Sequence, residues 1–273
     1  MQSDAIIRLA LREDIGSGDI TTEYLIDENA AGSAMIIAKE PLVVAGTEVA
    51  LRVFQLLDRE IDGRVCVTDG SDAAAGDVII HVRGRMRALL TGERTALNFL
   101  QRLSGIATHV RTFLGTLESS SVRLVDTRKT TPGLRTLEKY AVRTGGAHNH
   151  RMGLFDGVLI KDNHILACGG IRQAVEAVRR RAHHLLKIEV EVSDREQLRQ
   201  ALDAGADVIM LDNMDLKGIE QAVALINGAA AVEVSGGITR QNINQLVQAG
   251  VDIVSVGAMI HAARSVDISM TIE

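Results

Sequence analysis

The pattern of apolar positions changes near residue 120, after which short apolar runs alternate with stretches of helical period. The runs are almost continuous in Val, Ile and Leu, which is typical of strands covered by helices on one face and by a barrel core on the other. Strands that alternate with helices predict a parallel sheet. Six such runs lie at 122–127, 157–162, 186–192, 207–213, 231–237 and 252–258.

Two of these runs resemble one another, which indicates one strand–helix module used twice. They are DAGADVIMLDN at 203–213 and QAGVDIVSVGA at 248–258. Because six strands are fewer than the eight of a closed barrel, an incomplete α/β barrel and a doubly wound α/β sheet both fit the pattern. Both architectures bind ligands at the carboxyl ends of their strands.

The first part of the chain has a different rhythm. An amphipathic helix is predicted at the start, where Ile6, Ile7 and Leu11 share one face. From about Gly32 to Met86 the sequence consists of short β-rich runs punctuated by Gly and Pro, with one helical interval at 47–60. This pattern predicts a small α/β layer domain, and a long helical stretch leads out of it.

Composition narrows the possible functions. The chain has 273 residues, 46% of them hydrophobic, and 30 cationic against 35 anionic side chains, for a net charge of −5. This balance argues against a general binder of nucleic acid or of membrane surfaces, and aromatic residues are only 2%, too few for stacking platforms. Cys66 and Cys168 are far apart, so we expect reduced thiols. With no signal-peptide pattern or membrane-length apolar run, we expect a cytoplasmic protein.

Charged residues and glycines gather where the predicted strands end. Lone Lys or Arg residues in loops are usually solvated, but several at one end of a parallel sheet form a candidate site. Glu189 and Glu191 alternate with valines and therefore share one side of their strand, so one is expected to serve catalysis and the other the barrel interior. The strand-end residues are Asp126, Arg128, Lys129, Lys161, Asp162, Glu189, Glu191, Asp212, Asn213, Ser235, Gly236, Gly237 and Gly257.

Three features of this part of the chain indicate that it binds a polyanion and a metal ion. VSGGIT at 234–239 is expected to follow a strand and open a helix, so that its backbone N–H groups approach a phosphate. Glu191 and Asp212 are carboxylates of the kind that hold Mg²⁺, directly or through water. His148 and His150 form H-x-H without a third ligand at metal-site spacing, so an anion donor is the better interpretation than zinc.

The segment DTRKTTPGLRTLEKYAVRTGGAHNHRMGLFDGVLIKDNHI at 126–165 resembles the signature region of the quinolinate phosphoribosyltransferase family. The resemblance extends to ALREDIGSGDITT near the start, to GERTALNFLQRLSGIAT, and to EVEV, VIMLDN and VSGGIT, and therefore covers nearly the whole chain. Together these motifs are far more specific than any one of them.

The resemblance implies an α/β fold of two domains, an N-terminal α/β sandwich at 1–107 and an incomplete, about six-stranded α/β barrel at 108–266. A tail at 267–273 is expected to pack back on the first domain. The resemblance also implies a head-to-tail homodimer in which Arg94 reaches the neighbouring active site. The implied reaction joins quinolinate to phosphoribosyl pyrophosphate (PRPP) with Mg²⁺ and gives nicotinate mononucleotide, pyrophosphate and CO₂.

Site residues follow from matching the motifs position by position. Around quinolinate the resemblance places Arg94, Arg128, Lys129, His150, Arg151 and Lys161. Around the ribose and the Mg-pyrophosphate it places Glu191 and Asp212, and around the 5-phosphate Ser235, Gly236 and Gly257. The catalytic set is expected to be Lys129, Lys161, Glu191 and Asp212, with Glu191 and Asp212 also as metal ligands.

One departure from the family pattern is Gly145-Gly146-Ala147, where the family has three glycines. Three rival interpretations remain. A molybdenum-associated relative with the same fold is expected to lack the K-D-N-H sequence that this chain retains. A non-catalytic sensor of a sugar phosphate would need the glycine turns but not Glu191, Asp212, Lys161 and Arg94 together. A nicotinate-using transferase would need fewer cations that bind carboxylates.

Overall fold

The structure is a computed structural model that describes residues 4–117 and 122–273, and its chain forms two compact units. Unit 1 consists of residues 1–112, 130–146 and 259–273, and unit 2 of residues 113–129 and 147–258. The sequence predicts a division after residue 107, with a tail at 267–273 that packs back on the first domain. In the structure the returning C-terminal segment is longer, 259–273, and residues 130–146 also belong to unit 1; hydrogen bonds to α4 (Met86–Leu114) account for their place there.

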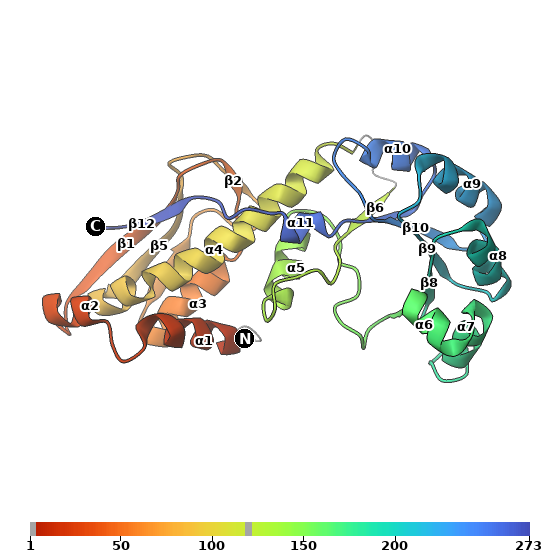
Figure 1. The fold of residues 1–273 in the computed structure, drawn as a ribbon. Helices are drawn as coiled ribbons and strands as arrows, with labels where there is room; N and C mark the ends of the chain where they lie inside the picture. The colour runs from red at the N-terminus through yellow and green to blue at the C-terminus, as the bar shows by residue number, and fades with distance from the viewer. Residues whose placement is uncertain (1–3, 118–121) are drawn as a thin grey trace. The chain divides into compact units, whose positions relative to one another are not determined.

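Unit 1 is built on an antiparallel sheet in the order β12-β1-β5-β3. In β1 every second residue from Ala34 to Ala38 is buried, so one face of the sheet is covered and the other is not. Helices α3 and α4 lie along the sheet in Figure 1, and Phe54 of α3 reaches the Gly92 position of α4. The strands are β1 (Ala31–Ala38), β3 (Asp62–Val65), β5 (Val78–Arg85) and β12 (Ile268–Ile272), with a separate pair β2 (Leu42–Val43) and β4 (Asp72–Ala73). The first three helices are α1 (Asp4–Ile15), α2 (Ile20–Leu25) and α3 (Thr47–Leu57).

The C-terminal segment belongs to this sheet. β12 pairs antiparallel with β1, and the side chain of Gln101 on α4 donates to the carbonyl of Ile268 at 2.8 Å. Residues 268–272 therefore complete the edge of a sheet whose other strands come from the first third of the chain.

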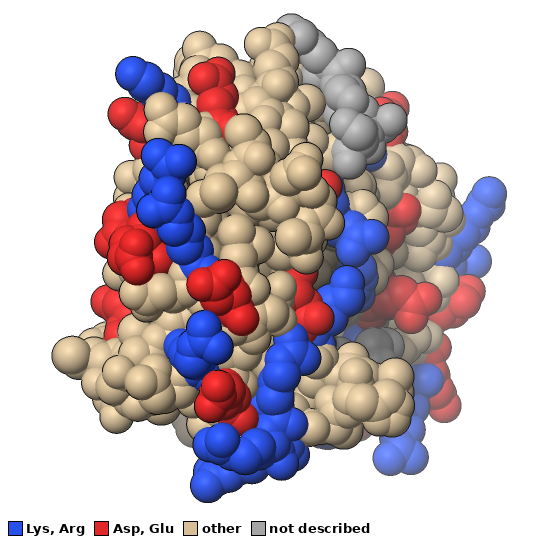
Figure 2. Space-filling view, turned by 90° about the vertical axis from the view of Figure 1, so that its right-hand side faces the viewer, with Lys and Arg blue, Asp and Glu red and all other residues tan. Residues whose placement is uncertain are grey.

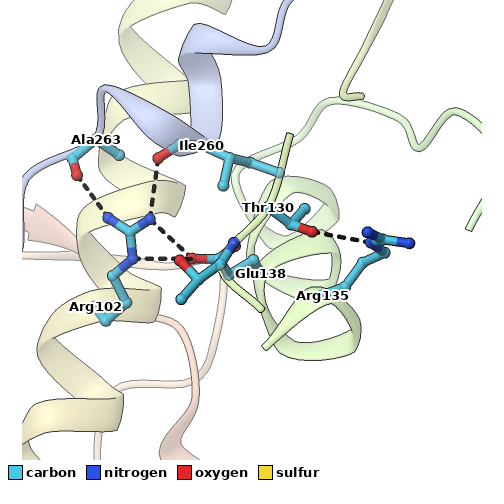
Figure 3. A network of polar contacts seen from close by, with 7 residues as sticks. Arg102, Thr130, Arg135, Glu138, Ile260 and Ala263 are labelled. Atoms are coloured by element: carbon cyan, nitrogen blue, oxygen red, sulfur yellow. Dashed lines mark hydrogen bonds and ion pairs between the residues drawn. The ribbon is translucent and has the colours of Figure 1, made fainter. Parts of the chain in front are cut away.

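A buried ion pair ties α4 to α5 (Arg135–Thr144) and to the segment after α11 (Ala258–His261) (Figure 3). Glu138 is fully buried, and its Oε1 accepts from Arg102 Nε at 3.1 Å and Nη2 at 2.8 Å. The same guanidinium donates to the carbonyls of Ile260 and Ala263, and Thr131 donates to the carboxylate from its backbone and its hydroxyl. One arginine therefore holds three segments that are distant in sequence.

Unit 2 contains six parallel strands in the order β6-β11-β10-β9-β8-β7. They are β6 (Arg123–Val125), β7 (Val158–Ile160), β8 (Ile188–Val192), β9 (Val208–Asp212), β10 (Ala231–Ser235) and β11 (Ile253–Ser255). The order advances in one rotational direction and never reverses, as it would in a doubly wound sheet. Among the described residues β6 and β7 do not pair with each other, which leaves the barrel open between them. The prediction of an incomplete six-stranded α/β barrel is confirmed.

Helices follow β7, β8, β9 and β10. They are α6 (Asp162–Cys168), α7 (Ile171–Arg179), α8 (Arg195–Asp203), α9 (Leu216–Ile226) and α10 (Ile243–Gln248), and α7 to α10 each bury apolar residues. The inward residues of α7 are Ile171, Ala174 and Val175, which are buried at helical spacing. On the face in Figure 2, cationic and anionic side chains are interspersed, without one broad area of a single sign. No helix among the described residues is long and apolar enough to cross a membrane.

The buried ion pair of unit 1 predicts a large effect of Arg102→Ala. This change leaves the buried Glu138 carboxylate without its cation, so we expect the free energy of unfolding to fall by about 3 kcal/mol. Chemical denaturation monitored by circular dichroism measures the loss.

Arg180→Ala is the matched control, because the Arg180–Glu176 pair joins side chains that are 72% and 54% exposed. An exposed pair of this kind contributes less than about 0.5 kcal/mol. Equal losses in the two variants would contradict the role assigned to Arg102.

Candidate active site

The carboxyl ends of the barrel strands carry most of the residues that the sequence singled out. Lys161 directly follows β7, Glu191 is next to last in β8, and Asp212 ends β9. Asp212 is the register partner of Ser235, which ends β10, and Ser235 is in turn the partner of Ser255 in β11. Parallel pairing therefore brings these positions to one end of the barrel, together with Gly257 after β11 and with Arg128 and Lys129 after β6.

Lys161 and Glu191 form an ion pair across neighbouring strands. The distance from Lys161 Nζ to Glu191 Oε2 is 2.8 Å, and the carboxylate is largely buried while the ammonium is about half exposed. The backbone N–H of Lys161 donates to His164 Nδ1 at 3.0 Å, so the histidine of K-D-N-H holds the peptide that carries the lysine. The result is a preformed acid–cation pair at the site, with one face open to solvent.

A glycine turn after β10 meets the end of β9. Gly236 has φ +91°, and a Cβ there would lie 2.1 Å from Asn213 Oδ1, so only glycine fits. Asn213 has φ 52°, donates its N–H to the carbonyl of Ser235 at 3.1 Å and donates its amide to Asp212 Oδ2 at 2.8 Å. These bonds fix Asp212 and the glycine turn relative to each other.

The expectation that VSGGIT opens a helix directly is wrong. Helix α10 begins only at Ile243, because the Asn242 side chain accepts from Thr239 N–H and donates to the carbonyl of Gly237, which closes a separate turn. Donors for a phosphate at this turn would be backbone N–H groups of the loop rather than a helix N-terminus.

Two arginines lie close together beside the open edge of the barrel. The pKa of Arg151 is lowered, first by burial and then by the charge of Arg128. Arg151 Nη1 donates to the carbonyl of Gly157 at 3.0 Å, which holds the guanidinium near the start of β7. Neighbouring guanidinium groups repel each other, so this arrangement favours an anion with more than one negative charge.

His150 points into the barrel interior. Its Nδ1 accepts the backbone N–H of Arg151 at 2.8 Å, so the ring proton lies on Nε2. Nε2 is 3.2 Å from Glu189 Oε2 and 3.5 Å from Glu233 Oε1. Nδ1 therefore holds the Arg151 peptide, and Nε2 faces the two acids.

Glu189 and Glu233 form a buried acid pair. Burial and the nearby Glu189 carboxylate raise the pKa of Glu233 to about 8, so its protonated form is favoured at neutral pH. The cluster borders a cavity of about 440 Å³, which is also lined by the first residues of four strands, Arg123, Val158, Val208 and Ile253. His150 thus faces the end of the barrel interior opposite to Lys161 and Asp212.

Two groups of residues offer ligand atoms for a metal. His150, Glu189 and Glu233 place one ligand atom each within 4.8 Å of one another. A metal on His150 Nε2 would require a proton on Nδ1, which already accepts the Arg151 N–H, so protons rather than a metal fit this cluster. Glu191 and Asp212 instead supply carboxylate oxygens at the open strand ends, and hard divalent cations prefer such donors.

The sequence missed two structural acids. Asp126 was noted only as a strand-end residue, yet it is fully buried and accepts from His150 N–H and from the Asn149 side chain. Glu233 was not singled out at all. The signal for Glu233 was its place in AVEVS, where one acid stands between two β-branched apolar residues as Glu189 does in IEVEV.

Arg94 belongs to unit 1, whereas the residues at the ends of the barrel strands belong to unit 2. It is exposed on α4, and among the described residues it makes no hydrogen bond or ion pair.

Comparison with known proteins identifies the chain. Residues 19–104 match the N-terminal domain of quinolinate phosphoribosyl transferase, and residues 106–271 match its C-terminal domain. The chain belongs to the quinolinate phosphoribosyltransferase family. A probable nicotinate-nucleotide pyrophosphorylase (carboxylating) of Bacillus subtilis is 45% identical, over 95% of this chain and 90% of the relative. A relative of the same name from Synechocystis is 44% identical, over 96% and 90%.

Solved structures agree with this membership. NadC from Streptococcus pyogenes is 43% identical, covers 99% of this chain and 95% of its own, and superposes with a TM-score of 0.94. The family resemblance read from the motifs is therefore confirmed over both units.

In this family member the buried Glu233 predicts a pH-dependent stability. Its pKa is about 8 when folded but near 4.5 when unfolded, so the stability it contributes is present below about pH 4.5 and is lost as the pH rises through about 8. Glu233→Gln mimics the protonated acid, so the melting temperature should fall less steeply with pH in this range than in the wild type.

Glu220→Gln on the exposed surface of α9 serves as the control and should leave the wild-type slope unchanged. An unchanged slope for Glu233→Gln would mean that Glu233 titrates normally. Melting curves at several pH values provide the measurement.

The glycine turn predicts a difference between two adjacent substitutions. Gly236→Ala puts a side chain on a backbone conformation that disfavours one, and its Cβ collides with Asn213. We expect the free energy of unfolding to fall by about 3 kcal/mol. Gly237→Ala adds the conformational strain alone, since nothing lies within 4 Å of its Cβ, and should cost about 1 kcal/mol. Equal denaturation midpoints would show that the Asn213 contact is easily displaced.

Proposed function

We propose that this protein transfers the phosphoribosyl group of PRPP to quinolinate with decarboxylation, giving nicotinate mononucleotide, pyrophosphate and CO₂ for NAD biosynthesis. Membership of the family and the activity for which its relatives are named support this function. The observation that carries it is the proximity of two guanidinium groups, those of Arg128 after β6 and Arg151 before β7. A molecule with two neighbouring carboxylates relieves the repulsion between them.

Quinolinate is held by cations in this proposal. Arg128 and Arg151 bind its carboxylates through parallel N–H donors, and Lys129 adds a point charge. His150 positions Arg151, because its Nδ1 accepts a hydrogen bond from the Arg151 backbone N–H. Lys161 directly follows β7, the other edge strand of the sheet.

The phosphoribosyl end lies over β8 to β11. Ser235, Gly236 and Gly257 supply backbone and hydroxyl donors for the 5-phosphate. Glu191 and Asp212 accept from the ribose hydroxyls and would hold Mg²⁺, directly or through water, because their carboxylate oxygens suit that cation. When bound, Mg²⁺ would offset the negative charge of the pyrophosphate.

The proposed chemistry begins when the bond between C1 of the ribose and pyrophosphate breaks and leaves an oxocarbenium-like sugar. Glu191 and Asp212 stabilise that positive charge electrostatically. The ring nitrogen of quinolinate then forms the new bond to C1. The nitrogen becomes cationic, so the neighbouring C–CO₂⁻ bond can break with its electron pair on the ring carbon, and CO₂ leaves.

A proton then replaces CO₂ on that ring carbon. Lys129 and Lys161 are the two candidate donors, since both ammonium groups belong to the strand-end set. Lys161 also keeps Glu191 in place through its 2.8 Å contact.

We further propose a cytoplasmic homodimer in which Arg94 of the partner subunit completes the quinolinate site. The exposed position of Arg94 on α4, without a partner among the described residues, supports this role.

The activity can be measured with purified protein, Mg²⁺, PRPP and quinolinate. We expect release of CO₂ and pyrophosphate in equal amounts, and no turnover when nicotinate replaces quinolinate, because nicotinate lacks the second carboxylate. Turnover with nicotinate would favour the nicotinate-using transferase, and binding of a sugar phosphate without any turnover would favour the sensor.

Subunit mixing tests the shared site. Arg94→Ala and Lys129→Ala should each reduce kcat/KM by at least about 100-fold, since each removes a charged contact to the substrate. A mixture of the two variants should recover part of the activity, because some heterodimer sites contain neither change. Failure to recover activity after proven subunit exchange would contradict the sharing of Arg94.

A further inference from the structure

We infer that Asp126 is a positioning residue that sets Arg151 against Arg128, so that the two guanidinium groups match a pair of adjacent carboxylates. This inference rests on the proposed function, because it concerns how that function's acceptor is recognised. Asp126 acts without touching the substrate.

The Asp126 carboxylate joins two segments of the chain. Its Oδ1 accepts the backbone N–H of His150 at 2.9 Å, and its Oδ2 accepts the Asn149 side-chain amide at 2.6 Å. Its own backbone N–H donates to the carbonyl of His148 at 3.1 Å. Asp126 therefore holds residues 148–150 in register beside the end of β6.

Each of these segments carries a cation close to the contact. Arg128 comes two residues after Asp126, and Arg151 directly follows His150. The bonds to Asp126 thus fix the backbone just before each of the two arginines. The His150 ring adds a second hold, since its Nδ1 accepts the Arg151 N–H.

Electrostatic repulsion explains why the two arginines have to be held in position. Two guanidinium groups without a ligand repel, and flexible loops would let them separate. Asp126 is 0% exposed, and a buried carboxylate is costly unless charge and hydrogen bonds compensate for it. Its two acceptor bonds use that buried charge to keep the arginines together before the substrate arrives.

The inference predicts a selective loss of dicarboxylate binding. Asp126→Ala removes both acceptor bonds and should raise the Kd for phthalate, an unreactive dicarboxylate, and the KM for quinolinate by about 10- to 100-fold. The KM for PRPP should change less than about twofold, because those two bonds go to residues 149 and 150, which precede Arg151 and are not among the proposed phosphoribosyl contacts. Calorimetry with phthalate and initial-rate kinetics measure these values.

A charge exchange provides a rescue test. Asn149→Asp alone replaces the hydrogen bond to Asp126 with repulsion between two carboxylates and should weaken phthalate binding. Adding Asp126→Asn restores one donor and one acceptor, and the double variant should recover phthalate affinity to within a few-fold of wild type. This rescue also covers the case in which Asp126→Ala does not fold.

Asp207→Asn is the matched control. Asp207 also uses Oδ2 to accept a backbone N–H, that of Ile188 at 2.8 Å, but it lies at the starts of the strands. It should leave phthalate affinity unchanged.

Two results would overturn the inference: unchanged phthalate affinity in folded Asp126→Ala, or no recovery in a folded double variant. Wild-type protein that neither binds phthalate nor uses quinolinate would instead contradict the proposed function.

Discussion

Parallel pairing of six strands that advance in one rotational direction is the constraint on which the candidate site depends. It places the end of every strand at the same end of unit 2, although the residues there come from segments between 125 and 257. The backbone hydrogen bonds of β8 to β11 determine where Glu191, Asp212 and Ser235 lie relative to each other. β6 and β7 are the two edge strands of this sheet, and both are followed by cations, Arg128 and Lys129 after β6 and Lys161 after β7.

The charges at this end differ in how they are balanced. Lys161 and Glu191 neutralise each other, so that part of the site is stable without a ligand. Arg128 and Arg151 instead repel each other, and burial first and the charge of Arg128 second lower the pKa of Arg151. A polyanion relieves this repulsion, which gives a reason for the cations to gather in a chain whose net charge is −5.

Buried acids organise the barrel in two ways. Asp126 is held by donors from a neighbouring segment and fixes that segment in place. Glu233 and Glu189 lie together around His150, and burial favours a proton on Glu233. Both arrangements hold residues 149–151. The short segment before β7 is therefore positioned by acids that lie after β6, in β8 and in β10.

The sequence by itself determined the strands of the barrel, their parallel direction, the family and the residues at the strand ends. These features depend on local period and on motifs, and both are visible along the chain. Local period left a barrel and a doubly wound sheet both open, and only the family resemblance implied the barrel, because strand order is set by long-range pairing. Only the tertiary structure turned His150 inward, made Asp126 and Glu233 internal acids, moved the start of α10 to Ile243, and returned 130–146 and 259–266 to unit 1 together with the expected tail. Each of those outcomes depends on which side chains meet across distant segments, and no local pattern of polarity contains that information.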